Sequence, residues 1–198
     1  MMRVTTLYAA TAATTAGYYT RYLTEATGEL PGQWFGNQAD RIGVRGEVTT
    51  EALQALLSGC DPVTGATLGH RLVDRTLSNG KVIRAVAGFD ATLSAPKSLS
   101  VLWALTSDDG LAECHDVAVR AVADYLERFG ATTCVRSNGI RMHLDTNDLT
   151  MAAFRQTTSC ADDPQLHTHL DSSPKKPGRG LAWARSGAWV LEGGAVVP

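Results

Sequence analysis

The sequence predicts an α+β fold in which a largely antiparallel β-sheet is flanked by helices, which are expected on one side of it. Short segments rich in β-branched and aromatic residues follow one another without a helix between every pair, whereas parallel pairing would require such a crossover. Other segments carry apolar residues at helical spacing. The chain has 198 residues, of which 44% are hydrophobic and 19% charged, so it is long enough for one domain with a sizeable core.

One strand and two helices are predicted in the first third of the chain. Residues 3–8 combine valine, threonine, leucine and tyrosine, a composition typical of a strand. A helix is expected from about residue 12 to residue 26, with Gly28 to end it. A second helical pattern occupies residues 50–57, for which Thr50 is a suitable N-cap.

The middle of the chain predicts a kinked strand followed by a helix. Residues 81–94 mix β-branched residues with a central glycine, which indicates a strand with a kink or bulge near Gly88. Pro96 then begins a helix that runs to about Leu105, capped by one of the two residues before the proline. Further strands are predicted at residues 132–136, 149–158 and 165–170.

The clearest helix is predicted between Asp108 and Phe129, and Gly130 ends it. Its apolar residues recur every 3.6 positions, so they are expected to form the face that packs on the sheet. His115 lies on this helix and is interpreted as a packing or surface residue. The expected buried face consists of Leu111, Cys114, Ala118, Ala121, Val122, Tyr125, Leu126 and Phe129.

The predicted domain organisation is a folded part at residues 1–170, which is the N-terminal part of a domain, and a tail at residues 171–198. The tail is rich in glycine and proline and follows neither a helical nor a strand period, so we expect it to be disordered or aberrant and the fold to be incomplete at its C-terminus. No apolar run approaches the ~18 residues of a membrane helix. We therefore expect a cytoplasmic protein with no membrane partner.

Charge and cysteine usage exclude several classes of site. The formal net charge is -2, so composition shows no basic excess of the kind that DNA-binding domains usually carry. The four cysteines form no C-x-x-C pair, which argues against a zinc ribbon, a redox motif or a disulfide framework. Any nucleic-acid contact must therefore come from local groups of arginine and lysine.

The most informative pair of residues is His167 and His169. In an extended strand, side chains two positions apart leave the same face, so both imidazoles can bind one metal ion. A third ligand is needed to complete such a site, and open positions are needed for a substrate oxygen. The alternative interpretation is a pair of surface histidines on an edge strand.

Two further groups can take part in phosphate chemistry. Tyr18 and Tyr19 are adjacent on the predicted first helix, and a tyrosine hydroxyl can attack phosphorus when the phosphate is oriented. Asp90 lies in a predicted strand, and Lys97 lies in the first turn of the next helix, where free N–H groups favour a phosphate. The alternatives are half-buried packing tyrosines, a ladder-edge carboxylate and a solvated lysine.

Together, these segments resemble the MobF-type conjugative relaxases, the TrwC relaxase family of the HUH endonucleases. The resemblance spans about residues 1–170 and is carried by the strand followed by paired tyrosines, by the G-x-D-x-T-x-S-A-P-K-S segment at residues 88–98, and by T-S-x-x-D-D-P-Q-L-H-T-H at residues 158–169. It implies a metal-assisted transesterification that nicks single-stranded DNA at a transfer origin, with a tyrosine left on the 5′ phosphate.

The resemblance also implies a role for each matching residue. Tyr18 matches the leading nucleophile and Tyr19 the alternative one, while Asp90 matches an acid that orients or deprotonates at the site. His167 and His169 match two of three metal-binding histidines. This chain has Gln156 where the family has the third, and a glutamine carbonyl suits a hard cation such as Mg²⁺ or Mn²⁺. Cys160 stands where the family usually has arginine.

The implied partners are single-stranded DNA at a transfer origin and accessory relaxosome proteins. Arg3, Lys97 and Arg155 are the candidate DNA contacts. Two alternative functions remain open at this point. One is an inactive, truncated relaxase fragment that retains some DNA affinity. The other is an unrelated metal-dependent hydrolase that uses the two histidines and Asp90 while the tyrosines are structural.

Overall fold

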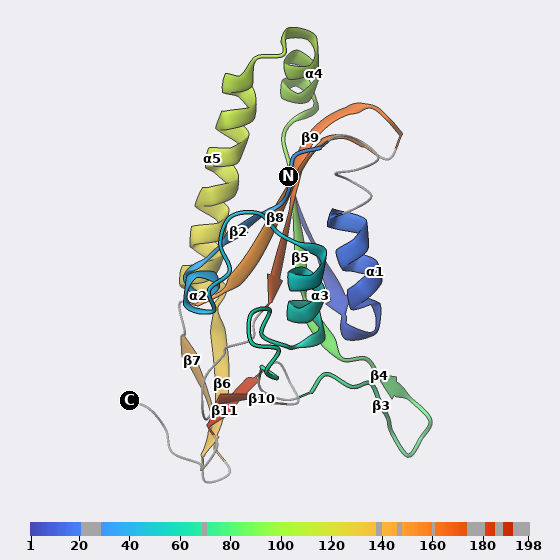
Figure 1. Cartoon of the computed structure of the whole chain (residues 1–198), viewed down its shortest axis with the longest axis vertical. Helices are drawn as coiled ribbons and strands as arrows, with labels where there is room; N and C mark the ends of the chain where they lie inside the picture. The colour runs from blue at the N-terminus through green and yellow to red at the C-terminus, as the bar shows by residue number, and fades with distance from the viewer. Residues whose placement is uncertain are drawn as a thin grey trace.

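The computed structural model has a five-stranded antiparallel sheet at its centre (Figure 1). It describes residues 1–20, 29–68, 71–137, 140–145, 148–159, 161–173, 181–184 and 188–191. The strand order across the sheet is β1 (Met2–Tyr8), β5 (Val86–Ser94), β9 (Pro164–Ser173), β8 (Thr150–Thr158) and β2 (Gln33–Phe35). All neighbouring strands run antiparallel, as the sequence predicted.

Helices cover both faces of this sheet (Figure 1). The predicted α+β class is confirmed, but the expectation of helices on one side alone was wrong. The short helix α1 and helix α3 lie over one face, and the long helix α5 lies along the other. The helical segments are η1 (Ala9–Thr11), α1 (Ala12–Gly17), α2 (Asn37–Arg41), α3 (Thr50–Ser58), α4 (Lys97–Thr106), α5 (Asp109–Tyr125) and the π-helical turn η3 (Leu126–Gly130).

Three two-stranded hairpins lie outside the central sheet among the described residues. They are β3 (Arg75–Thr76) with β4 (Val82–Ile83), β6 (Thr132–Ser137) with β7 (Ile140–Asp145), and β10 (Leu181–Ala184) with β11 (Ala188–Leu191). The sequence predicted β6 but not β7 or β3. It also predicted one strand over residues 81–94, and this was wrong, because the segment divides into β4 and β5.

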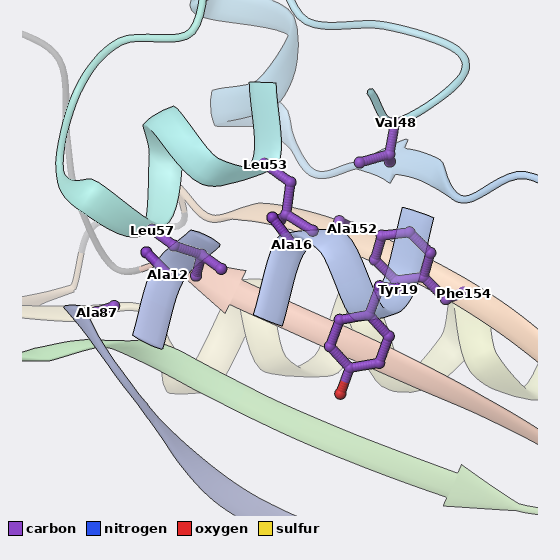
Figure 2. Close-up of a cluster of buried hydrophobic side chains, with 9 residues drawn as sticks. All are labelled: Ala12, Ala16, Tyr19, Val48, Leu53, Leu57, Ala87, Ala152 and Phe154. Atoms are coloured by element: carbon purple, nitrogen blue, oxygen red, sulfur yellow. The ribbon is translucent and has the colours of Figure 1, made fainter. Parts of the chain in front are cut away.

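The core on the α1 face joins helix α1, helix α3 and strand β8 (Figure 2). Ala12 and Ala16 on α1 pack with Leu53 and Leu57 on α3, and small residues let the two helices approach closely. In Figure 2 the ring of Tyr19 lies beside Phe154, and its hydroxyl oxygen points away from the aliphatic side chains. This core therefore positions an aromatic residue with its polar end outside the apolar cluster.

The core on the opposite face is built mainly from alanine, leucine and methionine beneath α5. The predicted buried stripe of α5 was wrong by one residue: Ala112, His115, Val119 and Ala123 are buried, whereas Tyr125 is exposed. The buried stripe thus combines two alanines with His115 and Val119, whereas the larger apolar residue Tyr125 lies outside. Periodicity gives the spacing of a stripe, but size complementarity with the sheet decides which stripe is buried.

Helix starts differ from the expected caps at two places. The hydroxyl of Thr49, not that of Thr50, accepts a hydrogen bond from Ala52 N at 3.2 Å at the start of α3. Helix α4 has Pro96 in the cap position, and no side chain caps it. Asp108 caps α5 by accepting from Gly110 N at 2.9 Å. Such one-residue shifts are common because capping depends on backbone dihedrals at the turn.

Strand β9 runs through Ser173, three residues beyond the strand end predicted from the sequence. Most of residues 174–198 lie outside the described part of the chain, so the predicted division into residues 1–170 and a disordered or aberrant tail stays a prediction. Residues 21–26 of the predicted first helix and Cys160 are also outside it. Among the described helices, none combines the length and apolar character needed to span a membrane.

The irregularity predicted near Gly88 is present. The β1–β5 register shifts between Leu7 and Tyr8, so that Leu7 faces Gly88 but Tyr8 faces Val86. A Cβ atom on Gly88 would collide with the backbone carbonyl oxygen of Ser172 on the neighbouring strand. Only glycine therefore permits this close approach of β5 and β9.

We expect Gly88→Ala to lower the free energy of unfolding by about 1–3 kcal/mol, because a backbone atom has to move to accept the new methyl group. Urea denaturation measures this difference. Gly17→Ala is the matched control, since a Cβ at Gly17 meets nothing within 4 Å. The free energy of unfolding of this variant should be unchanged or higher. Equal stability of the Gly88 variant and the wild type would contradict the close approach.

Candidate active site

The candidate site lies on the face of the sheet that α1 covers. Antiparallel partners share a face, and Asp90 on β5 is opposite Asp171 on β9, while Thr92 is opposite His169. His167, two residues from His169, is opposite Gln156 on β8. The register therefore gathers the acid, both histidines and the glutamine on one face, as the sequence motifs required.

The hydroxyl of Tyr19 reaches this face from the end of α1. It donates a hydrogen bond to Asp90 Oδ2 at 3.1 Å, and it lies 3.2 Å from His169 Nδ1. His169 Nδ1 also lies 2.9 Å from the same carboxylate oxygen. One oxygen of Asp90 therefore binds both the tyrosine hydroxyl and the imidazole, which fixes their relative positions.

Tyr19 is held as a protonated hydrogen-bond donor. Its side chain is buried and its ring stacks on Phe154 with centroids 5.0 Å apart. Burial raises the pKa of Tyr19 far above its ordinary value, and the negative charges of Asp171 and Asp90 raise this pKa further. A phenol with such a pKa releases its proton reluctantly, so the environment of Tyr19 suits positioning better than nucleophilic attack.

Tyr18 has the opposite environment. It follows α1 directly and is 40% exposed, and its ring packs edge-on against Tyr19 with centroids 5.2 Å apart. Adjacent helical residues point about 100° apart, which explains why one tyrosine enters the core and the other faces solvent. Tyr18 is therefore the more accessible of the two tyrosines.

The two histidines have the orientation of metal ligands. Each uses Nδ1 for a hydrogen bond within the protein, His169 to Asp90 and His167 to the backbone oxygen of Gln165 at 2.8 Å. Nε2 is then the atom of each ring that could bind a metal ion, and the ring centroids are 5.3 Å apart. Such second hydrogen bonds are the usual way in which a protein fixes the tautomer and direction of a metal-binding imidazole.

Gln156, the residue expected as a third metal ligand, is the cross-strand partner of His167. Its side chain is buried beside His167, and its amide nitrogen has no hydrogen-bond partner in the described part of the chain. Among the described residues, no three His, Cys, Asp or Glu side chains form a metal-binding group, so a three-ligand site needs this amide. Two imidazoles and one amide oxygen fit a divalent cation with open coordination positions.

The three candidate DNA contacts fall in different places. Arg3 is exposed on β1 opposite Thr92, so it shares the face of the site. Lys97 is exposed, and its Nζ donates to the backbone oxygen of Pro164 at 2.9 Å. Arg155 is on the opposite face and forms an ion pair with Asp116 at 2.7 Å. Their DNA-binding roles stay predictions.

A basic hairpin escaped the sequence interpretation. The β3–β4 hairpin projects from the body (Figure 1). Four exposed basic residues lie on it or next to it in the sequence. The Asn79-Gly80 pair at its turn, where Gly80 has φ +77°, is a hairpin signal that could have revealed it. The four residues are Arg71, Arg75, Lys81 and Arg84.

Asp171 was also missed, because the expected domain boundary placed it in the tail. It is buried beside Asp90, and neither of its carboxylate oxygens has a hydrogen-bond partner in the described part of the chain. Burial raises the pKa of Asp171 well above its ordinary value, and the charge of Asp90 raises it further. The sequence signal that could have revealed Asp171 is its spacing. It lies two residues after His169, so in a continued strand it shares the face of the two histidines.

His115 supports the site from the opposite face of the sheet. Its Nε2 lies 3.0 Å from the hydroxyl of Thr168, the residue between the two histidines. The side chain is buried, and burial lowers the pKa of His115 below its ordinary value. The contact ties helix α5 to the centre of the histidine motif.

Comparisons with known proteins agree with this arrangement. The family model described as TrwC relaxase matches residues 3–173. The metal-bound structure of the conjugative relaxase TrwC in complex with oriT DNA is 26% identical, with a TM-score of 0.74 over 96% of this chain and 61% of that one. A TrwC complex with a 27-mer DNA that comprises the recognition hairpin and the cleavage site is 26% identical, with a TM-score of 0.71 over 96% and 59% of the two chains.

Two curated relatives are both called multifunctional conjugation protein TraI. The Escherichia coli protein is 35% identical over 143 residues, and that of strain K12 is 37% identical over 142 residues. Each alignment covers 72% of this chain but only 8% of the relative. The chain thus spans less than a tenth of these relatives and about three fifths of the solved TrwC chains.

We expect acidification to destabilise the protein partly through His115. Because its pKa is lower in the folded state, the unfolded chain binds more protons as the pH falls below about 6.5, the unfolded value, and stability is lost there. His115→Gln keeps a partner for Thr168 but cannot titrate. Urea unfolding at pH 7.5 and pH 5.5 should therefore show that the free energy of unfolding falls less in the variant than in the wild type.

The pKa of His167 is also lowered, chiefly by burial, so His167 contributes to the acid loss in both proteins. The quantity to compare is therefore the loss of unfolding free energy between pH 7.5 and pH 5.5, in the wild type and in the His115 variant. An identical loss of stability in both would mean that His115 does not contribute to the pH dependence.

Proposed function

Because the chain belongs to the TrwC relaxase family, we propose that it is a strand-specific DNA nickase of a conjugative element and that it acts on single-stranded DNA at a transfer origin. The observation that carries this proposal is the joint hydrogen bonding of Tyr19 and His169 to Asp90, which brings the tyrosine segment onto the histidine face. The TrwC structures in complex with oriT DNA support the substrate class.

We assign the nucleophile to Tyr18. It combines exposure to solvent with direct packing against Tyr19, which is itself anchored to Asp90. In the reaction, the Tyr18 oxygen forms a bond to the scissile phosphorus, and the bond from phosphorus to the 3′ oxygen breaks. The tyrosine remains on the 5′ phosphate, and the proton lost by the phenol balances the one gained by the leaving 3′ oxygen.

Tyr19 and Asp90 act as positioning residues in this scheme. The protonated Tyr19 hydroxyl and the His169 ring are both held by one carboxylate oxygen, so the helical turn that bears Tyr18 cannot shift without breaking buried hydrogen bonds. Placement of this kind accounts for much of enzymatic phosphoryl transfer, because a nucleophile in line with the phosphorus needs little further reorganisation.

The residues that would hold a divalent metal ion are His167, His169 and Gln156. Bound there, the ion would polarise a phosphoryl oxygen and offset negative charge at the phosphorus. The metal-bound and copper-bound TrwC structures support a metal requirement. For this chain, an amide oxygen in place of a third imidazole favours the harder cations, so we propose Mg²⁺ or Mn²⁺.

DNA contacts are proposed on the same side of the molecule as Tyr18. Arg3 lies on the site face, and the basic β3–β4 hairpin adds positive charge that the overall net charge of -2 conceals. Lys97 and Arg155 remain candidates for more distant parts of the strand. We further propose that the protein acts in the cytoplasm and that accessory relaxosome proteins assist it.

The covalent intermediate tests this proposal. With a labelled oligonucleotide that carries the cognate origin and with Mn²⁺, we expect Tyr18→Phe to abolish the phosphotyrosyl adduct, because the nucleophile is lost. Tyr19→Phe should reduce the rate by about 10- to 100-fold, because it only loosens the placement. Denaturing electrophoresis measures both, and circular dichroism controls for folding.

The outcomes separate the alternatives. An adduct that survives in Tyr18→Phe but is lost in Tyr19→Phe would overturn the assignment of the nucleophile. Absence of an adduct in the wild-type chain with any metal would favour an inactive fragment. Cleavage that survives removal of both tyrosines but is lost in His167→Ala would favour an unrelated metal-dependent hydrolase.

Metal preference tests the role of Gln156. We expect Gln156→His to bind Zn²⁺ at least about tenfold more tightly than the wild type, while Mn²⁺ affinity changes less, because imidazole is the softer ligand. Isothermal titration calorimetry on the protein without DNA measures both affinities. His167→Ala serves as a control that should weaken every metal. Unchanged affinities in the glutamine variant would place Gln156 outside the site.

A further inference from the structure

Glu29 lies beside strand β8, at the residue that follows Gln156. Its carboxylate oxygen Oε1 accepts two hydrogen bonds from Thr157, one from the backbone N–H at 2.7 Å and one from the hydroxyl at 2.6 Å. Hydrogen bonds to a charged acceptor at these distances are among the stronger ones in proteins. One oxygen of Glu29 therefore holds both donors of the residue next to the proposed metal ligand.

The register of the sheet explains why a side chain makes these contacts. Strand β2 pairs with β8 so that Gln33 faces Ala153, and extending this register by four residues brings Glu29 opposite Thr157. Strand β2 begins only at Gln33, and Pro31, which lies between, has no N–H to donate. The Glu29 carboxylate thus takes the place of a backbone acceptor beyond the end of the β2–β8 ladder.

The backbone at Gln156 needs such support, because the ladder on the other side of β8 is irregular at the same level. Gln156 faces His167 on β9, and the β8–β9 register then shifts before Thr158. The side-chain amide nitrogen of Gln156 has no hydrogen-bond partner in the described part of the chain. The hydrogen bond from Thr157 N to Glu29 fixes the peptide plane that joins Gln156 to Thr157, from which the Gln156 side chain leaves.

The charge of Glu29 acts on the same site. Burial lowers the pKa of His167, whereas the negative charge of Glu29 favours the charged form of this ring. Glu29 is therefore close enough to stabilise a positive charge at His167. A divalent cation carries twice the charge of an imidazolium ion, so the same carboxylate attracts it more strongly.

Given the metal site of the proposed function, on which this inference rests, we propose that Glu29 is a positioning residue of that site. Through Thr157 it holds the backbone from which the Gln156 amide is presented, and its charge attracts the cation. Glu29 is not itself a ligand, because among the described residues no three His, Cys, Asp or Glu side chains form a metal-binding group. Partners of this kind orient metal ligands and tune their affinity.

Mn²⁺ affinity of the full chain without DNA, measured by isothermal titration calorimetry, tests the proposal. Glu29→Gln keeps an acceptor oxygen but loses the charge, so we expect it to weaken Mn²⁺ binding about threefold. Glu29→Ala loses both and should weaken binding about tenfold or more. Glu113→Gln is the matched control: Glu113 is exposed on α5, across the sheet from the site, and its variant should bind Mn²⁺ as the wild type does.

Two further measurements separate positioning from charge. In a Gln156→Ala background, Glu29→Gln and Glu29→Ala should bind Mn²⁺ equally, because no amide remains to be positioned. Hydrogen exchange at the Thr157 amide should be slow in the wild type and in Glu29→Gln but faster in Glu29→Ala, because only the alanine variant lacks an acceptor. Circular dichroism controls for folding.

The outcomes distinguish this inference from the metal site itself. Wild-type Mn²⁺ affinity in both Glu29 variants, with binding that His167→Ala still weakens, would overturn the role of Glu29 and leave the metal site intact. A difference between the two variants that persists without Gln156 would overturn the positioning role. A wild-type chain that binds no Mn²⁺ would overturn the metal site and the role of Glu29 together. None of these measurements requires DNA cleavage, which the adduct experiment tests.

Discussion

The carboxylate of Asp90 is the constraint on which the candidate site depends. Its Oδ2 atom receives the hydroxyl of Tyr19, which follows α1, and the Nδ1 proton of His169 on β9. Because this oxygen is buried, both hydrogen bonds are stronger than they would be in water, and the loss of either removes one of the donors that stabilise the carboxylate. One side chain therefore fixes a helix, two strands and two functional groups relative to one another.

The fold makes this constraint possible because the two faces of the sheet differ in composition. The face beneath α5 is packed with small and aliphatic residues, while the face beneath α1 becomes polar along Asp90, His167 and His169. The strand period of two makes this division possible, since alternate residues of β9 serve alternate faces. Thr168 shows the result: it lies between the two histidines in sequence but contacts His115 on the other side.

Burial distinguishes the two neighbouring tyrosines. Tyr19 is packed on Phe154 and held by Asp90, while the side chain of Tyr18 is 40% exposed. The same face then accommodates more negative charge than its described partners neutralise, because Asp171 is buried next to Asp90. Two carboxyl groups thus lie side by side beneath the segment that bears the two tyrosines.

The sequence by itself determined the fold class, the strands that carry the motifs and the placement of both histidines on one face, because these follow from local composition and the period of two. It could not give the buried stripe of α5, the strand break before β5 or the difference between Tyr18 and Tyr19. These three features depend on which surfaces pack against each other. The spacing of residues along the chain says nothing about the size or charge of the residues that they will contact. Tertiary packing alone brought Asp171 beside Asp90, since the pairing of β5 with β9 joins segments about eighty residues apart.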